Sequence, residues 1–143
     1  MLVKQLSLFL ENRAGRLAAA TRALAESKIN ILALSLADTA DFGVLRLIVS
    51  DPDAGKAALK DAGFTVVTSD VIAVEVEDKP GGLARILDIL ERAGINVEYM
   101  YAFSCAKTQQ AALIFRFEDN EAAVKCLTKA RVGVMKKVDV LGA

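Results

Sequence analysis

Two turn segments of this sequence carry residues whose types and spacing suit the binding of a small charged molecule. They read Asn12-Arg-Ala-Gly15 and Asp78-Lys-Pro-Gly81-Gly82, and each follows a predicted strand and precedes a predicted helix. The backbone N–H groups at a helix start have no partner inside the helix and carry positive potential, so they attract a carboxylate or a phosphate. A glycine at this place lets a ligand approach the main chain closely.

Polar side chains near these turns would complete a site for a zwitterion. Asp78 or Asn12 would hold an ammonium group, while Asn30 and Asn96, at the predicted starts of the second strands, both donate and accept hydrogen bonds. A carboxylate site, an ammonium site and a bifunctional amide together match the backbone of a free amino acid. The alternative is a local role, because Asn and Asp also cap helices, and Gly and Pro also form turns, without any ligand.

Both turns belong to an internal repeat. The recurring segments are Glu11-Asn-Arg-Ala-Gly15-Arg-Leu17 with Glu77-Asp-Lys-Pro-Gly81-Gly-Leu83, and Ile29-Asn30-Ile31 with Ile95-Asn96-Val97. The period is about 66 residues, longer than the roughly 20–50 residues of stacked solenoid repeats. The repeat therefore predicts two small domains, residues 1–70 and 71–143, with no Gly/Ser-rich linker between them.

The hydrophobic pattern predicts the same six elements in each copy. Apolar residues alternate in the opening strands, and Leu83, Ile86, Leu87 and Leu90 fall at i, i+3, i+4 and i+7 of a helix. The later strands are expected at about 29–37, 44–49 and 65–69, and at about 95–103, 112–117 and 134–140. The order β-α-β-β-α-β predicts an α+β fold of two tandem ferredoxin-like units, each a four-stranded antiparallel sheet with both helices on one face.

Helix ends and one hairpin can also be predicted. Asp51 and Asp119 are expected to cap second helices that run through about 62 and 130. Gly94 marks the end of the second copy's first helix, where Lys28 stands in the first copy. The hairpin between the second and third strands is expected to be about two residues longer in the second copy.

The strands of the first copy predict a covered sheet. A sheet with helices on one face alternates apolar and polar residues when its other face is wet, as the strand with Glu75 and Glu77 does. The segments 31–36 and 45–49 are instead apolar on both faces. A second chain or a partner protein would cover such a face, and self-association into a homo-oligomer, a dimer in the simplest case, is the more economical expectation.

Composition excludes several functions. Lysine plus arginine and aspartate plus glutamate both number 18, so no basic excess suggests nucleic-acid binding. No apolar run is long enough for a membrane span, and no secretory signal is recognisable, so a cytoplasmic protein is expected. Histidine is absent, which excludes Ser-His and Cys-His nucleophile systems, and Glu75 with Glu77 fits a solvated strand face better than an acid–base pair. Neither an enzyme nor a cofactor or metal is expected.

Three other features have simpler explanations than a functional site. Cys126 lies on an apolar helix face and is expected in the core, while Cys105, near the longer hairpin, forms no metal motif. Tyr99, Tyr101 and Phe103 alternate along one strand face, as base-stacking aromatics do in RNA-binding modules of the same fold. The balanced charge and the lack of a basic, aromatic third strand make RNA binding the third choice.

The motifs resemble the signature of the ACT domain family. Asp78-Lys-Pro-Gly81-Gly-Leu83 with Ala93-Gly-Ile-Asn96-Val97 carries the stronger match, and the first copy is looser, with Ala14 where proline is usual. Together the two matches span essentially the whole chain and are most similar to stand-alone tandem ACT proteins. The resemblance implies small regulatory modules that bind amino acids and control metabolic enzymes, without a catalytic domain.

The resemblance also implies where the ligand lies. In such modules two units sit side by side, and the ligand contacts the strand-to-helix turn of one unit and the second strand of the other. Carried over by position, the implied ligand-binding residues are Asn12, Arg13, Ala14, Gly15, Asn30 and Ile31, and Asp78, Lys79, Gly81, Gly82, Leu83, Asn96 and Val97. Many such units bind nothing, so one binding and one vestigial unit are compatible with the resemblance. The alternative function is a constitutive protein-binding or oligomerisation subunit with no small ligand.

Overall fold

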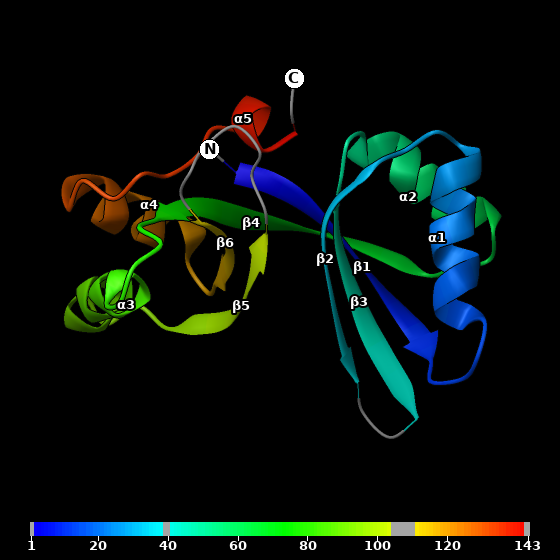
Figure 1. Ribbon diagram of the computed structural model, residues 1–143, viewed down its shortest axis with the longest axis horizontal. Helices are drawn as coiled ribbons and strands as arrows, with labels where there is room; N and C mark the ends of the chain where they lie inside the picture. The colour runs from blue at the N-terminus through cyan, green and yellow to red at the C-terminus, as the bar shows by residue number, and fades with distance from the viewer. Residues whose placement is uncertain (1, 39–40, 104–110, 142–143) are drawn as a thin grey trace. The chain divides into compact units, whose positions relative to one another are not determined.

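The computed structural model describes residues 2–38, 41–103 and 111–141 (Figure 1). It divides the chain into two compact units. The first module comprises Lys4–Ser69, and the second module comprises Asp70–Leu141 together with residues 2–3. Strands hydrogen-bond in the order β2-β3-β1-β4-β6-β5. None of the helices in the described ranges is long and apolar enough to cross a membrane.

The first module has the expected β-α-β-β-α-β order. Its elements are β1 (Leu2–Glu11), α1 (Arg16–Glu26), β2 (Ile31–Asp38), β3 (Phe42–Val49), α2 (Pro52–Asp61) and the start of β4 (Val66–Val76). Leu6 pairs with Leu47 and Leu8 with Leu45, so alternate residues of β1 and β3 lie on one face. These leucines are fully buried together with Leu24 of α1. Figure 1 shows α1 and α2 on the same side of these strands.

The second module repeats this arrangement on the remainder of β4. Its elements are α3 (Gly82–Arg92), β5 (Val97–Phe103), β6 (Ala111–Phe117), α4 (Asn120–Lys129) and α5 (Lys137–Leu141). Both β4 and β5 pair antiparallel with β6, so β6 lies between them as the third strand of this unit. Phe115 and Phe117 of β6 are buried against Ile86 and Leu90 of α3, which are the predicted i+3 and i+7 core positions.

The predicted closing strand at 134–140 is wrong. Only Val134 forms a bridge, with Val74, and the chain then turns into α5. The physical reason lies in β4, which continues without interruption from the first module into the second. The neighbour of β4 on this side is β1, and residues 2–3 at its start belong to the second module. Because this edge is already paired, the C-terminal segment cannot extend along it.

The helix ends follow the sequence signals. The carboxylates of Asp51 and Asp119 accept hydrogen bonds from the N–H groups of Ala54 (3.1 Å) and Ala122 (3.0 Å). Lys28 ends α1 in the left-handed conformation, with φ of 57°, where Gly94 has φ of 69° after α3. The last-turn leucines, Leu24 and Leu90, are buried in both modules. The predicted hairpin difference and Cys105 lie outside the described residues.

The helix-free face of the first module is buried only in part. Ile48 and Ala33, which pair across β3 and β2 on this face, are 0% and 5% exposed within the single chain. Phe9 and Phe42, near the other end of the same face, are 60% and 53% exposed. Self-association stays a prediction.

Candidate functional site

The two strand-to-helix turns leave helix starts without side-chain caps. Gly15 and Gly81 precede α1 and α3 with φ of 91° and 89°, a left-handed conformation that favours glycine. No side chain caps either helix, and neither has an acidic residue in its first turn, in contrast to α2 and α4 with their aspartate caps. Neither helix start is therefore neutralised by a capping carboxylate, and each keeps the positive potential of a helix N-terminus.

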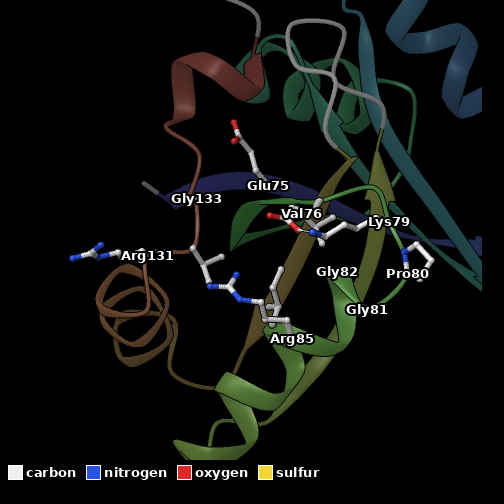
Figure 2. Close-up of a pocket in the computed structure, with 12 residues that line it drawn as sticks. Glu75, Val76, Lys79, Pro80, Gly81, Gly82, Arg85, Arg131 and Gly133 are labelled. Atoms are coloured by element: carbon white, nitrogen blue, oxygen red, sulfur yellow. Dashed lines mark ion pairs between the residues drawn. The ribbon is translucent and has the colours of Figure 1, made fainter.

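The second module forms a cavity of about 340 Å³ at the start of α3. It lies between the turn, the end of β4 and the segment that follows α4 (Figure 2). Its lining residues are Glu75, Val76, Glu77, Lys79, Pro80, Gly81, Gly82, Arg85, Ile86, Arg131, Val132 and Gly133. This volume matches the lower range of pockets that hold small molecules.

Charges of both signs border this cavity. Lys79 Nζ lies 2.8 Å from a carboxylate oxygen of Glu77. The hydrogen bond and the charge of Lys79 lower the pKa of Glu77, and Arg85 adds to the effect. Figure 2 shows Arg85 extending from α3 toward the segment that carries Gly133, whereas the side chain of Arg131 points away from the turn. The cation of Arg85 and the carboxylate of Glu77 therefore both lie close to the uncapped start of α3.

Gly82 allows the turn backbone to approach closely at the cavity wall. A Cβ built at this position would overlap the backbone carbonyl oxygen of Glu77, and it would lie 3.3 Å from a methyl carbon of Val76. Any side chain at position 82 would therefore force the turn to move. On the opposite wall, Val132 is a small residue that begins the segment after α4 and packs into the module core.

The predicted residues of the second turn divide into two groups. Lys79, Gly81 and Gly82 line the cavity, whereas Asp78 and Leu83 are exposed outside its lining. Asn96 and Val97 lie beyond the other end of α3, a helix of 11 residues and therefore about 16 Å long. Within one module the turn and the second strand do not meet. The predicted pairing of one module's turn with the other module's second strand stays a prediction.

The residues of the first turn border a smaller groove. Asn12 and Arg13 line about 70 Å³ of space with Leu10, Glu11, Leu17, Leu36 and Gly43, while Ala14 is exposed. Arg13 Nε forms an ion pair with Glu11 at 3.0 Å. Asn30 and Ile31 lie at the opposite end of α1. There the N–H of Asn30 donates to Ser50 Oγ (3.0 Å), and its carbonyl oxygen accepts from the N–H of Ser50 (2.9 Å).

Sequence reasoning missed several residues that line the cavity. The sequence places Glu77 on a solvated strand face, and Arg85 is not among the binding residues that it predicts. A signal for Arg85 exists, because it lies four residues after Gly81 and therefore one turn above the helix start. No comparable signal identifies Val132 and Gly133, which are distant in sequence and are brought to the cavity by the fold. Among the described residues, no cluster of Cys, Asp and Glu could hold a metal ion.

Comparisons with known proteins agree with this architecture. The family model described as "ACT domain pair" matches residues 1–141. The crystal structure of protein BT0572 from Bacteroides thetaiotaomicron is similar at 40% identity and a TM-score of 0.93, covering 100% of this chain and 98% of that one.

More distant structures share the fold alone. The regulatory subunit of aspartate kinase from Thermus thermophilus, in its ligand-free form, has 19% identity and a TM-score of 0.65, covering 90% of this chain and 93% of that one. The corresponding subunit from Thermus flavus has 17% identity and a TM-score of 0.59, covering 90% and 92%. The comparison with curated proteins finds no match.

Proposed function

The chain belongs to the ACT domain family, and from this membership we propose that it is a non-catalytic regulatory protein whose second module binds a free amino acid. The cavity of about 340 Å³ at the uncapped start of α3 is the observation that carries this proposal. Ligand binding would then signal to a metabolic enzyme in the cytoplasm. The fold shared with regulatory subunits of aspartate kinase supports a regulatory role.

The chemistry of the cavity suits a zwitterion. The ligand carboxylate would accept hydrogen bonds from the first-turn N–H groups of α3 and from Arg85, which lines the same space. The ammonium group would bind the carboxylate of Glu77, which is ionised at neutral pH and whose pKa is lowered by its hydrogen bond and ion pair with Lys79. Asp78, the residue that the sequence predicts for this role, lies beside the cavity on the exposed part of the turn.

Thermal melting against a panel of free L-amino acids tests ligand binding directly. A ligand at about 100 times its dissociation constant adds roughly 2.7 kcal/mol of stability, which corresponds to a rise in Tm of several degrees. Arg85→Ala should weaken the binding of that amino acid about tenfold or more, because a hydrogen bond to a charged group contributes roughly 1.5–3 kcal/mol. Isothermal titration calorimetry measures the change in affinity.

Matched variants separate the two possible ammonium partners. Arg92→Ala removes an arginine from the last turn of the same helix and should leave affinity unchanged. Glu77→Gln should weaken binding, and Asp78→Asn should not. The reverse result would assign the ammonium site to Asp78.

Two outcomes concern the alternative functions. If no amino acid in the panel changes the Tm, amino-acid binding is contradicted and a constitutive protein-binding subunit is favoured. Filter binding of single-stranded RNA tests the remaining alternative, an RNA-binding module.

A further inference from the structure

The backbone of the two turns establishes which residues correspond. The N–H of Arg16 donates to the carbonyl oxygen of Arg13 (3.4 Å), as the N–H of Gly82 does to that of Lys79 (3.1 Å). One turn later, Ala19 donates to Gly15 and Arg85 donates to Gly81, at 2.9 and 3.0 Å. Arg16 therefore occupies the place of Gly82, and Ala19 occupies the place of Arg85.

The segments after the second helices correspond in the same way. The N–H of Phe64 donates to the carbonyl oxygen of Leu59 (3.0 Å), and the N–H of Val132 donates to that of Leu127 (2.9 Å). The preceding residues, Gly63 and Arg131, both have positive φ, at 92° and 61°. Phe64 thus stands where Val132 lines the cavity of the second module.

In the first module these two larger residues lie against each other. The guanidinium carbon of Arg16 lies 4.8 Å from the centroid of the Phe64 ring, a cation–π contact. Arg16 Nε is shielded from solvent and has no hydrogen-bond partner among the described residues. Phe64 itself is 6% exposed and belongs to the core. The groove of the first module is lined by other residues, from β1, the turn, α1, β2 and β3.

The position of Arg16 is electrostatically unfavourable unless stacking compensates. It is the first residue of α1, where the helix dipole is positive and opposes a second cation. The contact with Phe64 offsets this repulsion and holds the side chain across the space between the turn and the end of α2. In the second module, Gly82 and Val132 leave that space empty, and Arg85 supplies a cation from the wall.

We propose that the chain binds one ligand per chain, in the second module, because the stacked Arg16 and Phe64 of the first module occupy the equivalent space. This inference rests on the proposed function for the identity of the ligand as an amino acid. The closure of the first module does not depend on the identity of the ligand, because it concerns which helix start is open to any small anion. Arg16 and Phe64 are then the residues that determine binding stoichiometry.

Amide chemical shifts of the ¹⁵N-labelled full chain test this proposal at both helix starts simultaneously. The probes are sodium sulfate and each of the twenty proteinogenic L-amino acids. In the unaltered chain, amides of 82–85 should shift and amides of 16–19 should not. In the Arg16→Gly, Phe64→Val double variant, which places the second module's residues in the first, both sets should shift. Arg22→Ala, on the exposed middle of α1, should behave like the unaltered chain.

The outcomes distinguish the two proposals. Shifts at both helix starts of the unaltered chain, or at neither with any probe, would overturn the one-site inference. A folded double variant that still responds only at 82–85 would also overturn it, and Arg16→Gly alone serves if the double variant does not fold. A response to sulfate in the expected pattern with no response to any amino acid would refute the proposed function and leave the closure of the first module standing.

Discussion

Glu77 and Lys79 determine the acid–base behaviour at the mouth of the cavity. The pKa of Glu77 is lowered because Lys79 donates a hydrogen bond to its carboxylate and places a positive charge beside it. A carboxyl group with a lowered folded-state pKa contributes stability above its unfolded pKa, and that contribution is lost as the pH falls through the folded value. The relevant window therefore lies at and below the usual glutamate pKa of about 4.3.

Lys79→Ala should raise the pKa of Glu77 toward its ordinary value. The carboxyl ¹³C shift of Glu77, followed by NMR as the pH is lowered, measures this change directly. Lys125→Ala, an exposed lysine on α4 outside the cavity lining, is the matched control and should leave the titration unaltered. A Glu77 titration that is the same with and without Lys79 would contradict the assigned cause. Ligand affinity should fall over the same acidic window, because protonated Glu77 no longer attracts an ammonium group.

For individual residues, the sequence predicts those of the turn but not all of those that line the cavity. Lys79, Gly81 and Gly82 were identifiable because helix starts and turn glycines have local signatures. Val132 and Gly133 were not identifiable, since they lie about 50 residues away along the chain and reach the turn only through the packing of α4. The choice between Asp78 and Glu77 depended on which neighbouring side chain faces the cavity, and spacing alone does not settle it.

The helices α1 and α3 end with the same backbone hydrogen-bond pattern, although different residues form it. In both, the last-turn leucine accepts a hydrogen bond from the residue after the left-handed position, Ile29 to Leu24 (3.0 Å) and Ile95 to Leu90 (2.9 Å). Lys28 holds the left-handed conformation in the first module, and Gly94 holds it in the second. A residue with a Cβ is disfavoured in this conformation by roughly 1–2 kcal/mol.

Lys28→Gly should therefore stabilise the first module by about 1 kcal/mol, since it removes this strain and leaves the hydrogen bonds in place. Gly94→Lys is the reciprocal variant and should destabilise the second module by a similar amount. Thermal melting of both variants measures the two shifts in Tm. A fall in Tm for Lys28→Gly would show that the lysine side chain stabilises the helix end by more than the backbone strain.

The elements were predictable where local chemistry dominates. Alternating leucines and the i, i+3, i+4, i+7 pattern located β1 and α3, and aspartate caps located α2 and α4. The strand expected at 134–140 failed for a reason that no local pattern contains. That segment could extend as a strand only along the side of β4 that does not face β6, and β1 is the neighbour of β4 on that side.

For the whole molecule, the start of the chain contributes to its second half. Residues 2–3 are part of the second module, and Val3 is fully buried. Val3→Asp should destabilise that module by about 2 kcal/mol or more, because a carboxylate would be buried without a partner. Hydrogen exchange of the Ile72–Phe115 strand pair should accelerate more than exchange of the Leu34–Leu47 pair.

Leu2→Asp is the matched control, since Leu2 is 42% exposed, and it should have a much smaller effect. Faster exchange confined to β2 and β3 would contradict the assignment of Val3 to the second module. The internal repeat made two similar units predictable, but it did not predict this contribution, because the first residues have no counterpart that repeats. The homo-oligomer, expected from apolar strands, also depends on surfaces that the repeat does not specify.

The close approach of Gly82 to the carbonyl of Glu77 prevents the first turn's sequence from replacing that of the second. Position 16 carries one of the longest side chains in the chain, whereas position 82 admits only a hydrogen atom without a change of the turn. A chimaera that copies residues 12–17 over 78–83 would look conservative in an alignment of the two halves. It would place an arginine where the backbone of the second turn leaves no room, so the second turn does not accept the sequence of the first.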